Sequence, residues 1–278
     1  MTDQVDTPSR PAPPLPDTRR TTLRDAVRAE RTKYGSVRTL GRITVVAVVL
    51  ASVLAIVFCI SIPVTRGTAI SAMKPQDVVS AGLLGIDVAA IVLVVLGAMF
   101  VGQEYSTGAI EQTFIITPKR ARVLVAKTLI IGPIAFGVGV VAAVIGLAVG
   151  GVVLLVAGSD VAAGYTAATF RLAAGSVAMP MVYAPLGVFA AFIFRSTSGG
   201  ILVPMTMGIL GGIFGWLPAS IAGWLIPLVP LAAVHTLSGA AQPGGPEDLG
   251  FGPAIVSLAL WLVVPYLIAR WRLTHKDA

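Results

Sequence analysis

Residues 102–127, GQEYSTGAIEQTFIITPKRARVLVAK, form a polar and basic segment between two long apolar runs. The runs on either side are long enough to cross a lipid bilayer as helices. An apolar span can have such a composition for no reason beyond solubility in hydrocarbon. A charged connector of this length needs another explanation, and its surroundings indicate the class of protein.

The composition predicts an all-α polytopic membrane protein. Hydrophobic residues make up 56% of the 278 residues and charged residues 12%, with a mean hydropathy of +0.89. Ordinary soluble domains carry about 25% charged residues, so this chain has too little polar surface to cover a body in water. The net charge of +7 gathers at the ends of apolar runs and not along a stripe, so we expect no nucleic-acid partner. Cys59 is the sole cysteine, which excludes a disulfide within the chain.

Six segments are long and apolar enough to span a membrane. They are residues 43–63, 79–101, 128–157, 174–194, 199–217 and 251–269. With the N-terminus inside, 17 of the 20 Lys and Arg residues fall on the inner side, and the positive-inside rule then predicts that both termini are cytosolic. Frequent Arg, Ala, Gly and Val are typical of a high-GC bacterial genome, so we expect a multi-pass protein of a bacterial plasma membrane.

The region before the first span divides in two. Residues 1–22 are rich in proline and predict a disordered cytosolic tail, which leaves 23–278 as one six-span domain. From Leu23 to about Leu40, apolar residues recur at helical intervals while the basic residues mostly occupy other faces. This pattern predicts a basic amphipathic helix in the membrane interface or, alternatively, a solvated helix before the first span.

Residues 219–234, ASIAGWLIPLVPLAAV, are apolar but too short for an ordinary span. Pro227 and Pro230 interrupt the run, and a seventh span here would place Arg270 and Arg272 on the outer side. We therefore expect a broken element on the outer face, either re-entrant or interfacial.

Small residues predict where helices pack closely in lipid. Gly146 and Gly150 have the GxxxG spacing, which lets two helix backbones approach each other. Two overlapping pairs of the same spacing follow in the fifth span, and we expect the tightest interface there: Gly208, Gly211, Gly212 and Gly215.

The chain shows no catalytic constellation and no metal-binding motif. His235 and His275 fall on opposite sides of the predicted membrane, and the GxxxxGK[ST] loop that binds ATP is absent. We therefore expect no enzyme activity from this chain alone. Asp87 is the one ionisable residue well inside a span; it either faces a polar pathway or reaches interfacial water at the outer end.

The connector itself predicts two helical pieces. Thr117 followed by Pro118 is typical of a helix start, with Thr as the N-cap and Pro at the first helical position. We expect a short helix, a break there, and a second helix that continues into the third span. A loop that only sets topology would need basic residues, but not a helix with two acids and an apolar face.

The order of these motifs resembles the permeases of the ABC-2 type exporter family. The resemblance rests on a connector with Glu104, Gly108, Pro118, Arg120 and Lys127, and on an amphipathic segment similar to the membrane-parallel elbow helix of that family. In that segment Glu30, Lys33 and Arg38 occupy the matching positions. Six spans and a broken outer element also agree, so the resemblance covers nearly all of the chain beyond residue 22.

The resemblance implies a permease subunit that forms a translocation pathway with a second copy or a related permease. It would dock on separate ATPase subunits, which bind ATP and Mg, so this chain itself would hold no cofactor. The segment after the second span would be the coupling helix, with Glu104, Tyr105, Gly108 and Glu111 at the partner and with Arg120 and Lys127 anchoring the return helix. One alternative is a secondary transporter, which would need several ionisable or unwound sites within the spans, where Asp87 alone qualifies. The other is a non-transporting membrane anchor or immunity protein.

Overall fold

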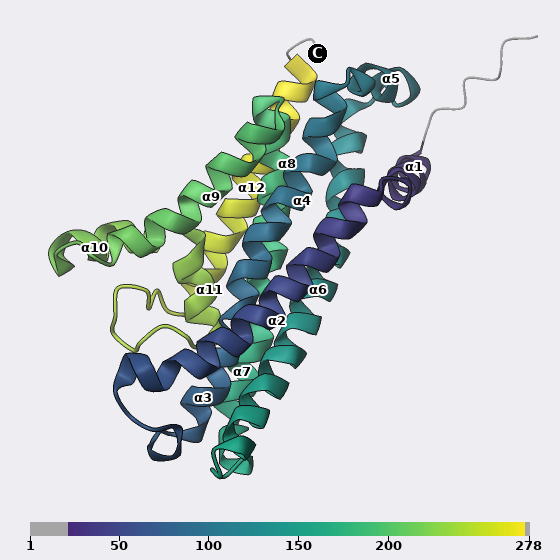
Figure 1. Cartoon of the computed structure of the whole chain (residues 1–278). Helices are drawn as coiled ribbons and strands as arrows, with labels where there is room; N and C mark the ends of the chain where they lie inside the picture. The colour runs from purple at the N-terminus through teal and green to yellow at the C-terminus, as the bar shows by residue number, and fades with distance from the viewer. Residues whose placement is uncertain (1–21, 276–278) are drawn as a thin grey trace, which may run out of the picture.

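The computed structural model describes residues 22–275, and every regular element within that range is helical (Figure 1). Six helices or joined helix pairs are long and apolar enough to cross a membrane, which agrees with the six predicted spans. They are α2 (Arg38–Arg66), α3 with α4 (Pro75–Gly82, Gly85–Ser106), α6 (Arg120–Val156), α7 with α8 (Ala167–Ser176, Ala178–Phe194), α9 (Thr197–Phe214) and α12 (Phe251–His275). The predicted tail, Thr22 excepted, lies outside the described residues.

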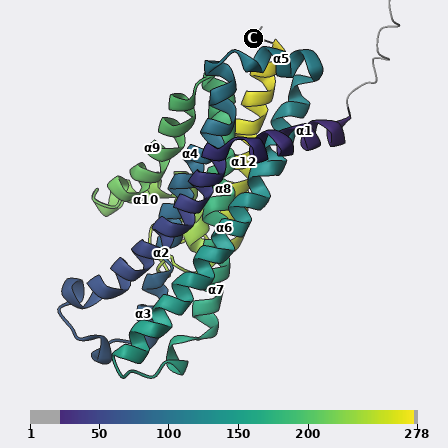
Figure 2. The same cartoon turned by 45° about the vertical axis from the view of Figure 1, so that its right-hand side comes forward.

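Shorter helices connect the spans. They are α1 (Leu23–Ser36), α5 (Ala109–Ile116), α10 (Ala219–Leu225), α11 (Pro230–Ser238) and the 3₁₀ turns η1 (Ile70–Ala72), η2 (Ala162–Gly164) and η3 (Ile226–Leu228). Both α1 and α5 lie at the same end of the bundle as the C-terminal end of α12 (Figures 1 and 2). We call this the basic end, because all described Lys and Arg residues except Arg66, Lys74 and Arg171 belong to segments there. The other end is the opposite end.

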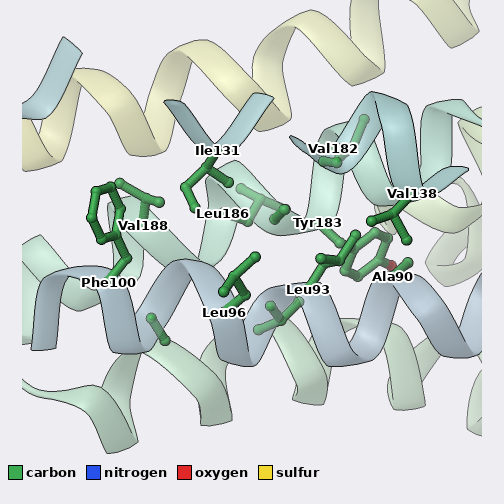
Figure 3. Packing of buried hydrophobic residues seen from close by; sticks show 14 of the residues in the cluster. Ala90, Leu93, Leu96, Phe100, Ile131, Val138, Val182, Tyr183, Leu186 and Val188 are labelled. Atoms are coloured by element: carbon green, nitrogen blue, oxygen red, sulfur yellow. The ribbon is translucent and has the colours of Figure 1, made fainter. Parts of the chain in front are cut away.

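Helices α4 and α8 form the centre of the bundle, and glycine allows them to touch. A Cβ on Gly97 would lie 2.3 Å from the carbonyl oxygen of Ala184, and one on Gly187 would lie 2.4 Å from that of Val94. Without side chains at these positions the two backbones meet directly, as small residues permit in lipid. Around this contact pack the buried residues Leu93, Leu96, Leu186 and Val188 (Figure 3).

The second close approach joins α3 to α6. A Cβ on Gly146 would lie 2.6 Å from the Gly82 oxygen, and one on Gly150 would lie 2.5 Å from the Val79 Cα. The predicted Gly146/Gly150 spacing therefore marks a real helix contact. Within this chain the pairs on α9 do not: nothing lies within 4 Å of a Cβ on Gly212, and Gly215 meets the carbonyl of its own helix. Gly208 and Gly211 meet side chains at ordinary or slightly short distances, not another backbone.

The N-terminal amphipathic segment is two helices and not one. Thr22 and Asp25 form a reciprocal capping box that starts α1, and α1 ends at an extended Val37. Arg38, which we expected in the amphipathic helix, is instead the first residue of α2. Figure 2 shows α1 lying across the basic end of the bundle.

The element between α9 and α12 is broken, as its prolines indicate. Residues 220–228 and α11 meet at an angle of 88°, with the break at Val229 before Pro230. In both views α9 leans away from the bundle and carries α10 outward (Figures 1 and 2). The break is thus present, and entry into the membrane from one side remains a prediction.

Candidate ion-pair cluster and connector helix at the basic end

Four charged side chains from three helices meet at the basic end. Lys127 of α6 places its Nζ 2.7 Å from Glu30 Oε2 and 2.8 Å from Glu104 Oε1. Lys33 of α1 places its Nζ 3.0 Å from Glu30 Oε1 and 3.0 Å from the same oxygen of Glu104. Each lysine therefore bridges both glutamates, and the four charges cancel. We call Glu30, Lys33, Glu104 and Lys127 the ion-pair cluster.

Burial differs sharply across the cluster. The Lys127 side chain is fully buried, whereas the Lys33 side chain is 37% exposed. Lys127 also donates a hydrogen bond to the carbonyl of Phe100 at 3.0 Å, and its Nζ lies 4.1 Å from the centre of the Phe100 ring. Burial opposes the charge of Lys33, but the Glu30 and Glu104 carboxylates outweigh it and raise its pKa above the ordinary value.

Helix extension brings Glu104 into this cluster. The second span was expected to end at residue 101, but α4 continues to Ser106, so Glu104 and Tyr105 lie on its last turns and not in the connector. Glu104 faces α1 and α6. Tyr105 faces the other way and packs edge-on against Phe192 of α8, with ring centres 6.3 Å apart.

Gly108 turns the chain from α4 into α5. Its φ of 72° is left-handed, a conformation that costs little only for glycine, and a Cβ there would meet open space. The predicted connector helix then follows as α5. Ile110, Thr113 and Phe114 face the bundle, while Glu111 and Gln112 are exposed.

The face of α5 that points away from the bundle also exposes two large apolar residues. Ile115 is 78% exposed and Ile116 is 68% exposed. A shallow cavity of about 360 Å³ adjoins this face and is lined by Glu111, Phe114, Ile115, Pro118 and Arg120. We call the exposed residues Glu111, Ile115, Ile116 and Pro118, together with the half-buried Arg120, the connector face. Ile115 and Ile116 belong to the apolar face predicted for the connector helix, but they were not among the residues predicted to contact a partner.

The helix start predicted at Thr117 is wrong. The N–H of Thr117 donates to the carbonyl of Thr113 at 2.9 Å, so Thr117 closes α5, and α6 begins at Arg120 with Lys119 as its cap. Pro118 follows the end of one helix and does not open the next, because proline cannot continue a helix. The predicted order of helix, break and helix is otherwise present.

Two contacts tie α5 to the rest of the basic end. The Lys33 Nζ donates to the hydroxyl of Thr113 at 2.9 Å, which joins α5 to the ion-pair cluster. The Arg120 guanidinium lies 5.0 Å from the centre of the Phe114 ring, which joins α5 to the first turn of α6. A force on α5 would therefore reach α1, α4 and α6 together.

The structure places Asp87 far from this cluster. It lies in the first turn of α4 and lines a separate cavity of about 540 Å³ at the opposite end, with His235. His275 lies at the end of α12, and within residues 22–275 no group of three His, Cys, Asp or Glu residues is placed to hold a metal ion.

Comparison with known proteins gives no matching family model and no matching curated protein. The resemblance to ABC-2 permeases thus depends on the residues of this chain alone. What the geometry adds is that four residues chosen for that resemblance, Glu30, Lys33, Glu104 and Lys127, form one contact network.

Proposed function

We propose that this chain is the permease subunit of an ATP-driven exporter of the ABC-2 type. A separate ATPase would bind the connector face, and the spans would form the translocation pathway with a second copy or a related permease. The basic end would lie in the cytosol with both termini, as the distribution of Lys and Arg favours. The membrane would be the plasma membrane of a bacterium.

The observation that carries this proposal is the exposed apolar pair on α5. Ile115 and Ile116 lie at the end of the bundle, beside the charged Glu111 and away from the long apolar surfaces of the spans. Exposed apolar patches rimmed by polar residues mark protein or membrane interaction sites, and a patch outside the predicted spans favours a protein partner. A loop serving topology alone would leave no reason for a helix with this face.

The bracing behind α5 supports a coupling role. A short helix of eight residues held by its own hydrogen bonds would fray, since isolated helices of this length are marginal in water. Thr113 and Phe114 tie it instead to the ion-pair cluster and to Arg120. A displacement imposed by the partner is then passed to α1, α4 and α6 as one body.

In this mechanism ATP favours one arrangement of the partner subunits, and the partner favours one arrangement of the spans. Coupling is then a shift between two conformations of the permease. The free energy of this shift is limited by the difference in the affinity of the ATPase for the two conformations. In this proposal α5 would be the coupling helix, which connects the ATPase to the spans, and α1 would be the membrane-parallel elbow helix. Residues 219–234 would be the broken element on the outer side, either re-entrant or interfacial.

A purification of the tagged chain with its ATPase tests the proposal. We expect a soluble P-loop protein, encoded beside this chain, to bind it and to hydrolyse ATP in the complex. Ile115→Glu and Glu111→Lys should each abolish this binding. Leu23→Glu is the matched control, because Leu23 is exposed on α1 at the same end but outside the connector face.

Two results would count against the permease assignment. One is transport by the purified chain alone, driven by a proton gradient, which would indicate a secondary transporter. The other is an equal loss of ATPase binding in Ile115→Glu and in Leu23→Glu. That result would show that the connector face is not the specific contact with the ATPase.

A further inference from the structure

The cavity beside Asp87 has the size and lining of a small-molecule site. Its volume of about 540 Å³ falls within the range of about 300–1,000 Å³ that such sites occupy. It lies at the opposite end, where the second span bends between α3 and α4 and meets α2, α7, α8 and α11. The apolar part of its wall is formed by Phe58, Ile62, Leu84, Leu172, Met179 and Val234.

The charges around this cavity leave one carboxylate without a partner. Arg66 Nη1 lies 2.9 Å from Asp77 Oδ2, and His235 Nδ1 lies 2.8 Å from Glu247 Oε2. Within the described chain Asp87 forms neither a hydrogen bond nor a salt bridge, although His235 acts on it through space. The paired groups cancel or nearly cancel, so Asp87 makes the cavity negative.

The position of Asp87 in its helix explains in part why a carboxylate is tolerated inside a span. Its place in the first turn of α4 lets the helix dipole stabilise a carboxylate. That explains why the charge is tolerated, but not why a cavity opens beside it. Ionisable residues inside spans that face a cavity are characteristic of substrate pathways.

Hydroxyl groups in the same wall add to the polar side of the cavity. Ser80 and Ser176 line it, and within residues 22–275 neither hydroxyl has a hydrogen-bond partner. Each can accept a hydrogen bond from an ammonium group that Asp87 attracts. A protonated amine has three donors, which matches one carboxylate and two hydroxyl oxygens in number.

We propose that this cavity binds an organic cation with an apolar body, with its ammonium group at Asp87 and its body against the apolar wall. If the permease function holds, on which this step rests, cationic amphiphiles are the class of molecule exported. An anionic amphiphile would be repelled by Asp87, because the Arg66–Asp77 pair is neutral, and a bare metal ion would lack the ligands that it needs.

A pair of fluorescent probes tests this without the ATPase. The full chain in nanodiscs of zwitterionic lipid is titrated with monodansylcadaverine, a primary amine, and with its N-acetyl derivative, which has the same fluorophore and no charge. We expect the amine to bind about tenfold more tightly or better, as a hydrogen-bonded charge pair would give. Equal binding of the two probes would overturn the proposal, and no variant is needed for this comparison.

Variants then locate the site. Asp87→Asn should bring the affinity for the amine down to that for the acetylated probe, while Asp87→Glu should keep most of the difference. Asp160→Asn is the matched control, because Asp160 is exposed in the loop after α6 and lies outside the cavity. Unchanged amine binding in Asp87→Asn would overturn the site even if the probes differ.

The outcome is separable from the permease assignment. If the amine does not bind but the ATPase still associates, the proposed cation site is wrong and the exporter assignment is unaffected. If the amine binds at Asp87 but no ATPase associates with the chain, the cation site is supported and the exporter assignment is wrong.

Discussion

Lys127→Met removes the buried ammonium at the centre of the ion-pair cluster while nearly preserving side-chain volume. Glu30 and Glu104, whose side chains are 3% and 13% exposed, then keep Lys33 as their one cation. Removing one partner of a buried ion pair costs about 3–5 kcal/mol, because the charge left behind is uncompensated and cut off from water. We expect the free energy of unfolding to fall by that amount.

Lys33→Met is the matched comparison. It deletes the same group from the same two carboxylates, at 3.0 Å from each where Lys127 lies at 2.7 and 2.8 Å, but at a position where the side chain is 37% exposed. Water can replace an exposed ammonium, so the expected loss is about 1 kcal/mol. The variant Lys127→Met with Glu30→Gln should recover part of the larger loss, because Lys33 and Glu104 then form a neutral pair.

The assay is equilibrium unfolding in mixed micelles of dodecyl maltoside and SDS, followed by the fluorescence of the four tryptophans. All variants are compared in the same lipid-free micelles at one pH. Equal losses for Lys127→Met and Lys33→Met would contradict this prediction, because the two lysines bridge the same carboxylates and differ most in burial. A double variant less stable than Lys127→Met would refute the charge argument.

Three further predictions concern other parts of the fold. Gly97→Val should destabilise the bundle by about 1–3 kcal/mol or more, since even its Cβ would overlap the Ala184 oxygen at 2.3 Å; Gly137→Val, which meets open space, is the control in the same unfolding assay. Gly108→Ala should cost about 1–2 kcal/mol through its left-handed φ, and Gly108→Asn less; weaker ATPase association in both equally would contradict this. The hydrogen bond to His235 lowers the pKa of Glu247, so the contact stabilises the loop of residues 239–250 above the ordinary carboxyl value of 4.5 and is lost as the pH falls through the lower folded value. The protection factors of the amides in residues 239–250, which are corrected for the intrinsic pH dependence of exchange, should therefore fall with acid in the wild type and depend less on pH in Glu247→Gln.

The spans could be predicted because hydrocarbon imposes a simple rule on composition and length. Ranges such as 128–157 are recognisable without knowledge of any neighbour. The helix ends were harder to place. Thr117 and Pro118 fit both the end of one helix and the start of the next, and the hydrogen bond from Thr117 to Thr113 decides for the end.

Contacts between helices could not be predicted from the sequence of one helix alone, because they depend on the surface of the partner helix. The spacing of Gly208 and Gly212 is the same as that of Gly146 and Gly150, but only the second pair meets another backbone. Gly82, Gly97 and Gly187 were missed, because the signal for each lies in the surface of its partner.

The ion-pair cluster shows the same limit. Glu30 and Lys127 are 97 positions apart and read individually as surface charges of a basic segment. Their order along the chain suggested a resemblance to a family, but no local pattern indicated that Lys127 is fully buried. Burial depends on α1 crossing the basic end, which periodicity within α1 does not specify.

The proposed contact between α5 and a separate ATPase can be measured by a site-specific cross-link. In a Cys59→Ala background, where the buried native thiol is removed, single cysteines are placed at Ile115 and, as a control, at Leu23. After treatment with a cysteine-to-lysine cross-linker, we expect Ile115→Cys to capture the P-loop subunit in the assembled complex, with a yield that ATP changes, and Leu23→Cys to capture little. Capture at Leu23 equal to that at Ile115, or none at Ile115 in a complex that hydrolyses ATP, would contradict the account.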